Sequence, residues 1–145
     1  MGAMLVAFHL HRRPVSLNSK HSRGYTQQIR DMARSCYSGP LMTSALYSRI
    51  IWFHKDKSSQ GDVDNIAKRV HDALKEVLFA DDRVITHTMA VRVDASEEVE
   101  LVADPDHPLA AAALAQSLYD GEVRDILYIE IGRQIDSKIH LGPIA

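Results

Sequence analysis

Acidic side chains and an amide gather between residues 61 and 74, where the sequence has its clearest potential for chemistry. Asp62, Asp64 and Asn65 stand close together, and Lys68 follows one helical turn later. Magnesium prefers oxygen ligands and usually takes one or two carboxylates together with substrate phosphate oxygens and water. Asp62 and Asp64 could supply those carboxylates. A nearby lysine could stabilise the charge on a transferred phosphoryl group or help to position the attacking water.

The same residues also have ordinary structural interpretations. Asp62 or Asp64 would make a good helix N-cap, and an acid near a helix start gains about 0.3 to 1 kcal/mol from the helix dipole. Asp64, Lys68 and Asp72 lie about 40° apart on a helix, opposite its apolar stripe, as an exposed ion-pair ladder would. Asp81 and Asp82 could form a turn. Spacing alone therefore leaves both the metal site and the structural interpretation open.

The elements that must position these residues alternate along the chain. Apolar side chains recur at helical spacing from Asn65 to Phe79, which predicts an amphipathic helix. The rest of the pattern predicts strands and helices in turn, at Met4 to Leu10, Tyr25 to Tyr37, Ala45 to His54, Val84 to Val93, Leu109 to Tyr119 and Ile126 to Ile131. The order β-α-β-α-β-α-β in 145 residues predicts a single compact α+β (mixed α/β) domain with a small sheet packed with helices.

Charge is distributed unevenly along the chain. The formal net charge is −2, but residues 1–57 carry nine Lys and Arg against two acids, whereas residues 58–110 carry five against twelve. The basic arm could follow a phosphate backbone, or it could be a solvated face that keeps the domain soluble. Its basic side chains are Arg12, Arg13, Lys20, His21, Arg23, Arg30 and Arg34.

Several classes of protein are not supported by the sequence. The single cysteine, Cys36, excludes an internal disulfide and a cysteine-based zinc cluster within one chain. His9 and His11 would share one strand face as a possible zinc pair, but no third ligand is evident. No apolar run approaches the roughly 18 to 20 residues that span a bilayer, and no secretory signal is recognised, so we expect a cytoplasmic protein.

A longer pattern contains the acidic cluster: D-x-D-N-x-x-K-x-x-x-D-A-L, a short spacer, then D-D-x-x-[VI]. Here it is filled by Asp62, Asp64, Asn65, Lys68, Asp72, Ala73, Leu74, Asp81, Asp82 and Ile85, and upstream Pro14, Ser16 and Asn18 form P-x-S-x-N. The pattern resembles the RusA family of Holliday junction resolvases, small homodimeric endonucleases of phage and bacterial origin. The match runs from about Pro14 to Arg92, more than half of the chain.

The resemblance implies a fold, a reaction and a set of functional residues. It implies an intertwined homodimer with a family core at about residues 4–93, to which residues 94–145 add an acidic loop, a helix and a strand. It implies cleavage of phosphodiester bonds in branched DNA by symmetric paired nicks, with Mg²⁺ as the cofactor and Mn²⁺ as a substitute. By position, Asp62, Asp64 and Asp82 match the catalytic, metal-binding aspartates and Lys68 the catalytic lysine. Supporting roles fall to Asn65, Asp72 and Asp81, and Arg92 lies where the family often has a basic residue. Together with the basic arm, this gives Arg12, Arg13, Asn18, Lys20, Arg23, Arg30 and Arg92 as the DNA-binding candidates.

Helix geometry places a demand on this assignment. A straight helix from Asp64 to Phe79 separates its ends by about 22 Å, so Asp82 would lie far from Asp62. Either the chain folds back sharply, or two copies pack head to tail so that each site combines Asp62 and Asp64 of one chain with Asp82 of the other. We favour the shared site, because a two-fold dimer also suits the near two-fold symmetry of a four-way junction.

Two other functions remain open at this point. The acidic stretch from Asp94 to Asp106 would repel phosphates, so a metal-dependent nuclease is a safer prediction than a junction resolvase. The chain could also be a non-catalytic dimeric DNA-binding or accessory protein on the same scaffold, or a magnesium-dependent hydrolase of other phosphate esters. Retention of the aspartates and the lysine argues against a protein that has lost its activity.

Overall fold

The computed structural model describes residues 4–16, 19–56, 62–102, 108–134, 139 and 141–143. It confirms an α+β domain in the predicted order of strands and helices. Its elements are β1 (Met4–Leu10), α1 (Ser22–Cys36), β2 (Leu46–His54), α2 (Val63–Leu74), a short 3-10 turn η1 (Asp82–Val84), β3 (Ile85–Asp94), α3 (Pro108–Tyr119) and β4 (Asp125–Arg133).

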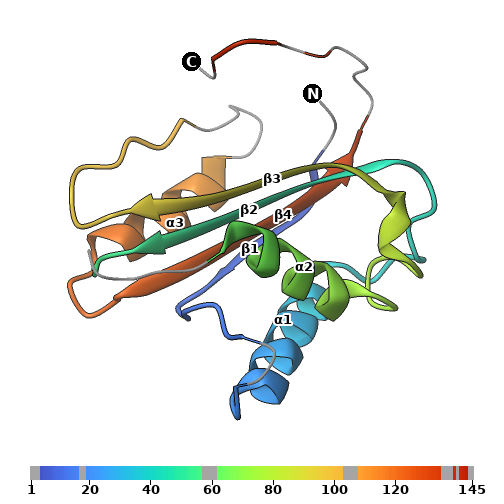
Figure 1. The fold of residues 1–145 in the computed structure, drawn as a ribbon, viewed down its shortest axis with the longest axis horizontal. Helices are drawn as coiled ribbons and strands as arrows, with labels where there is room; N and C mark the ends of the chain where they lie inside the picture. The colour runs from blue at the N-terminus through green and yellow to red at the C-terminus, as the bar shows by residue number, and fades with distance from the viewer. Residues whose placement is uncertain are drawn as a thin grey trace.

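The four strands form one mixed sheet in the order β1-β4-β2-β3 (Figure 1). β4 pairs antiparallel with β1 on one side and with β2 on the other, while β3 pairs parallel with β2. A parallel pair needs a crossover connection, and α2 provides it between β2 and β3. Figure 1 shows α2 running opposite to the direction of these two strands.

Helices α1 and α2 cover one face of the sheet (Figure 1). Because side chains alternate along a strand, every second residue of β2 points toward the helices. Leu46, Ile50 and Trp52 belong to this main core, whereas the next residue, Phe53, packs in a second cluster on the other face. Trp52 and Phe53 therefore lie on opposite faces of the sheet, and both are buried.

Helix α2 is shorter than its apolar pattern predicts. The expected helix ran to Phe79, but the structure ends it at Leu74, and Lys75 already has an extended backbone. Glu76 has a φ of 65°, and its N–H donates to the carbonyl of Phe79, so the chain turns tightly there. Val77, Leu78 and Phe79 are still buried. Their apolar pattern reflects burial in a turn rather than helical continuation.

The second face of the sheet is partly covered by α3. Leu114 of α3 packs with Phe53, Val123 and Ile126. His9 and His11 bring their Nε2 atoms to 3.0 and 2.8 Å from Ser117 Oγ, so the predicted pair does converge, but on a hydroxyl group of α3. No helix among the described residues is long and apolar enough to cross a membrane.

Candidate active site and nucleic-acid interface

The start of α2 presents two of the predicted catalytic acids. Asp62 is the N-cap, and its Oδ1 accepts a hydrogen bond of 2.9 Å from the backbone N–H of Asp64. Asp62, Asp64, Asn65 and Lys68 are all exposed, on the side of α2 that points away from the core. The prediction that Asp62 caps the helix is therefore confirmed. A capping carboxylate on an exposed helix start can still present oxygen to a cation.

The third predicted acid lies at the opposite end of α2. Asp82 begins the 3-10 turn that follows the helix, and its Oδ2 lies 4.0 Å from Lys75 Nζ. Lys75 Nζ also lies 3.4 Å from Asp72 Oδ1, three residues earlier on the helix. The hydrogen bond with Asp72 and then the charge of Asp82 raise the pKa of Lys75. One lysine thus links two of the acids that the family pattern contains.

Asp81 has a local structural role beside Asp82. Its Oδ1 accepts a hydrogen bond of 3.0 Å from the backbone N–H of Arg83, and its Oδ2 lies 3.5 Å from the guanidinium of the same residue. The backbone hydrogen bond is the main reason that the pKa of Asp81 is lowered. This confirms the turn that the Asp81 and Asp82 pair predicted, while the supporting role of Asp81 stays a prediction.

The two ends of α2 do not form one metal site within a chain. Asp64 and Asp72 are eight residues apart on the helix, which corresponds to about 12 Å along its axis. Carboxylates that share a magnesium ion each bring an oxygen to about 2.1 Å from it. Among the described residues of one chain, no three His, Cys, Asp or Glu side chains gather closely enough to hold a metal ion. The shorter helix and its tight turn bring Asp82 to Asp72 but not to Asp62.

A buried histidine lies directly beneath the acidic end of α2. His71 Nε2 lies 2.8 Å from Ser48 Oγ of β2, and Ser48 Oγ donates to Thr88 Oγ1 of β3 at 3.2 Å. Burial lowers the pKa of His71, and the charges of Asp82 and Asp72 oppose that shift. The sequence analysis did not single out this residue, although its place four residues after Ala67 and three before Leu74 puts it on the apolar side of the helix.

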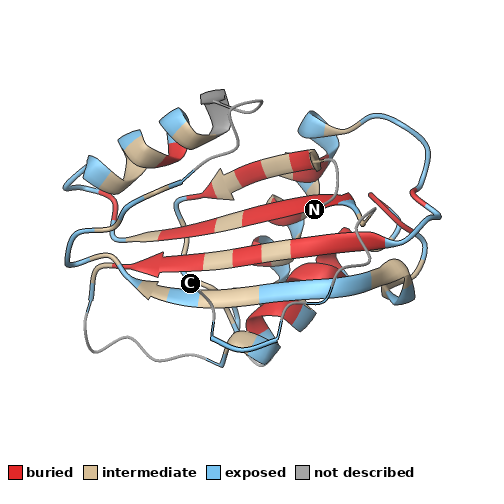
Figure 2. Cartoon of the chain, turned by 90° about the horizontal axis from the view of Figure 1, so that it is seen from above, coloured by how far each residue is buried: buried red, intermediate tan, exposed pale blue. Residues whose placement is uncertain are grey.

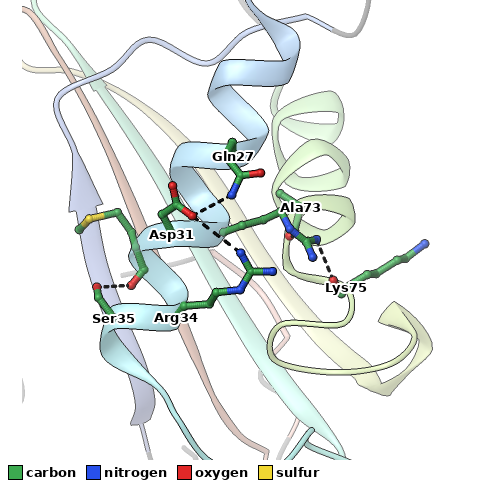
Figure 3. Close-up of polar contacts among 8 residues, drawn as sticks. Gln27, Asp31, Arg34, Ser35, Ala73 and Lys75 are labelled. Atoms are coloured by element: carbon green, nitrogen blue, oxygen red, sulfur yellow. Dashed lines mark hydrogen bonds and ion pairs between the residues drawn. The ribbon is translucent and has the colours of Figure 1, made fainter.

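Arg30 is half-buried and anchors the end of α2. Its Nη1 donates to the carbonyl oxygens of Ala73 and Lys75, both at 3.0 Å. Figure 3 shows Ala73 and Lys75 beside α1, with the side chain of Lys75 pointing away from that helix. Carbonyls at a helix end have no partner within the helix, so Arg30 satisfies them. Arg30 thus has a structural role at the end of α2, and its assignment to DNA binding stays a prediction.

The other basic residues of the arm surround the start of α1. Lys20 and Arg23 are exposed there, and with Ser19, Ser22, Thr26 and Gln27 they line an open recess of about 670 Å³. The first turn of α1 holds no acid, and its N-cap residue makes no side-chain capping bond. A helix start of this kind favours phosphate. Asn18, also assigned to DNA binding, lies outside the described residues.

Arg12 and Arg13 are partly engaged with the domain itself. Arg12 donates to Gln28 Oε1 at 3.0 Å and lies over the ring of Tyr25, and Arg13 lies 5.5 Å from the ring centroid of Trp52. These stacking contacts hold the arginines at the edge of the core. Arg92 is exposed on β3.

Arg69 connects the basic recess to α2 and was not predicted from the sequence. Its Nη2 donates to Ser22 Oγ at 2.5 Å. Two buried polar atoms nearby, Arg69 Nε and Tyr25 Oη, have no hydrogen-bond partner. Burial raises the pKa of Tyr25, and the cationic side chains of Arg69 and Arg12 oppose that shift. The recess is therefore joined to the middle of α2 through this hydrogen bond.

Comparisons with known proteins agree with the residue pattern. The family model for endodeoxyribonuclease RusA matches residues 10–102, which is more than half of the chain. This range contains the basic arm, both ends of α2 and β3. A search of curated proteins finds no match.

Proposed function

This chain belongs to the RusA family of endodeoxyribonucleases, and from that premise we propose that it resolves branched DNA by Mg²⁺-dependent, symmetric paired nicks at a four-way junction. The observation that carries the proposal is the placement of acids at both ends of α2. Asp62 and Asp64 are exposed at its start, and Asp82 is held at its end. Each chain then presents two halves of an acidic site, and neither half is complete alone.

The donor set fits a hard divalent cation. Asp62 and Asp64 supply carboxylate oxygens, and Asp82 of a second chain would supply another, which leaves room for phosphate oxygen and water. When bound, the cation would activate water and neutralise charge on the scissile phosphate. Lys68, on the same exposed side of α2, would stabilise the charge that develops on the phosphoryl oxygens.

A shared site requires that the start of α2 in one chain meets Asp82 of its partner. In a two-fold dimer this contact occurs twice, so two equivalent sites form. Two sites related by a two-fold axis would place nicks symmetrically on opposing strands of a junction. A homodimer is therefore part of the proposed mechanism.

The basic recess would hold the DNA arms near these sites. Lys20 and Arg23 at the start of α1 are joined to α2 through the hydrogen bond between Ser22 and Arg69. Each phosphate neutralised by such a side chain releases counterions and adds to the salt dependence of binding. After β3 the chain carries acidic residues from Glu97 to Glu100 and then leads to α3. Both segments lie on the far side of the sheet from α1.

The nuclease proposal is tested with a synthetic four-way junction, a linear duplex and single strands, each incubated with Mg²⁺, Mn²⁺ or EDTA. We expect paired nicks in the junction with either metal and no cleavage with EDTA. Glu122→Gln, an exposed carboxylate in the turn before β4, is the matched control for Asp64→Asn. Binding without cleavage would indicate an accessory protein, and hydrolysis of small phosphate esters with an intact junction would indicate a different phosphatase-type activity.

The shared site is tested by mixing inactive subunits. In a dimer of one Asp64→Asn chain and one Asp82→Asn chain, a shared arrangement leaves one site with both changes and one site intact. Random mixing should restore roughly a quarter of the wild-type sites, and the products should be single nicks because only one site per dimer works. If the mixture is no more active than either variant alone, each site belongs to one chain.

A further inference from the structure

The outer edge of β3 is a long strand edge without the features that usually protect one. Among the described residues, no strand pairs with this side of β3. Ten residues form the strand, and Ile85 to Val91 contain no charged residue and no proline. Thr86, His87, Thr88 and Met89 are exposed. Proteins normally protect such an edge with lysine, proline, a bulge or a covering element, because its unpaired backbone groups recruit another strand.

The opposite edge of the sheet is different. β1 has no exposed residue in Met4–Leu10, and it contacts both α1 and α3. Figure 2 shows one edge strand of the sheet with long exposed stretches, while the inner strands are largely buried. Of the two edge strands, only β3 has exposed residues, and it begins three residues after Asp82.

We propose that β3 pairs antiparallel with β3 of a second copy of this chain, so that the two sheets join and the acidic half-sites of the two chains meet. The proposal rests on the proposed function for the need to bring these acids together. The partner strand is that of a second copy of this chain, because the pairing would bring Asp82 of one chain to Asp62 and Asp64 of the other.

The direction of α2 explains why this pairing completes the site. His71, late in α2, bonds Ser48, which pairs with Thr88 near the start of β3. Asp62 lies nine residues before His71, about 14 Å back along the helix, which equals about four residues of strand. Since α2 runs opposite to β3, Asp62 lies near the level of Arg92, toward the end of β3. Asp82 lies just before its start.

An antiparallel two-fold pair reverses these levels between the chains. The axis is perpendicular to the joined sheet, so both copies of α2 stay on the same face. With the axis at Thr88, or within one residue of it, Asp82 of one chain comes level with Asp62 and Asp64 of the partner subunit. Neighbouring strands are about 4.8 Å apart, so two helices lying over β2 and β3 would be about 10 Å apart. That is an ordinary helix packing distance.

Two-fold symmetry makes the register measurable by cysteine cross-linking. One residue must lie directly opposite its own copy, with a Cα separation of about 4.5 to 5.5 Å, which a disulfide can bridge. One residue further along, the separation already exceeds that reach. We therefore replace Cys36 by serine and introduce single cysteines as His87→Cys, Thr88→Cys, Met89→Cys and Ala90→Cys. The chain with its exposed native Cys36 on α1 is the control.

We expect mild oxidation to give a strong disulfide dimer at one of the positions from 87 to 89, with weak or no product at its neighbours. The chain containing only Cys36 should stay uncross-linked. No cross-link at any of the four positions, in protein that is still dimeric by sedimentation, would overturn the pairing. So would equal cross-linking at all positions and in the control, because that indicates random collision.

A charge test covers the case in which cysteine variants fold poorly. Met89→Lys and Met89→Glu each place like charges close together across the proposed axis, so each variant alone should sediment largely as a monomer. An equimolar mixture should recover the dimer. Dimers that persist in both single variants would overturn the pairing.

The outcomes separate this inference from the proposed function. Restored activity in mixed Asp64→Asn and Asp82→Asn dimers, with no β3 cross-link, would keep the shared site and reject β3 as the interface. A specific β3 cross-link in protein that does not cleave DNA would keep the interface and reject the nuclease proposal.

Discussion

The two ends of α2 carry the same kind of side chain but hold it in different ways. At the start, Asp62 is fixed only by its own helix, through the bond from the Asp64 N–H. At the end, Asp72 and Asp82 are joined through Lys75, and Arg30 of another helix binds the last carbonyls. The first end is thus built by local sequence and the second by tertiary structure. Substitutions at the two ends should therefore fail in different ways.

The largest effect is expected from removing an acid at either end. Asp62→Asn, Asp64→Asn and Asp82→Asn should each lower the cleavage rate at least about a hundredfold, because each removes a charged metal ligand. Junction binding should survive or tighten, since repulsion of phosphate also falls. Asparagine caps helices about as well as aspartate, so Asp62→Asn should keep wild-type stability. Cleavage rates, binding curves and urea unfolding check this. Unchanged cleavage in Asp62→Asn would assign that residue to capping alone.

Substitution of Arg30, which binds the end of α2, should lower the free energy of unfolding. Arg30→Met leaves the carbonyls of Ala73 and Lys75 without their charged donor, so the free energy of unfolding should fall by about 1.5 to 3 kcal/mol. Arg34→Met, which removes only an exposed ion pair with Asp31 (Figure 3), should cost less than about 1 kcal/mol. Urea unfolding measures both. Equal losses would mean that Arg30 does not anchor α2.

The sequence predicts the start of α2 better than its end, for a physical reason. Capping and helix periodicity act within a few residues, so Asp62, Asp64 and the helix face could be placed from spacing. The helix stop could not, because the apolar residues Val77 to Phe79 continue the helical pattern while their burial depends on the rest of the fold. Lys75 could have been found as the i+3 neighbour of Asp72. The Arg30 contact spans more than forty residues of sequence and leaves no local signal.

His71, beneath the end of α2, should make the free energy of unfolding depend on pH. Burial lowers the pKa of His71 in the folded chain below its usual value of 6.5, so the unfolded chain binds the proton more readily. Stability should then be full above about pH 6.5 and fall as the pH drops below it. His71→Gln should fall less between pH 7 and 5, measured by urea unfolding at each pH. His21→Gln, at the exposed start of α1, is the control and should keep the wild-type slope.

Substitution of Lys75 should change the Mg²⁺ requirement for cleavage by a smaller factor. Its ammonium lies close to Asp72 and Asp82, so it competes with a cation for the same carboxylates. Lys75→Met should lower the Mg²⁺ concentration for half-maximal cleavage by roughly two- to fivefold, because exposed charges interact weakly. Lys75→Arg keeps the charge and should behave like the wild type. A higher Mg²⁺ requirement in Lys75→Met would show instead that Lys75 mainly positions Asp82.

The smallest expected effect concerns the basic recess at the start of α1. Arg23 is exposed at the recess that Ser22 and Arg69 connect to α2. If it contacts one phosphate, Arg23→Gln should make the slope of log affinity against log salt less steep by about 0.9. Arg124→Gln, an exposed arginine before β4, removes the same charge far from the recess and should leave the slope unchanged. Binding of an uncleaved junction in EDTA at several salt concentrations measures both. Equal changes in the slopes of the two variants would mean that net charge governs binding. The DNA would then not lie along the recess at the start of α1.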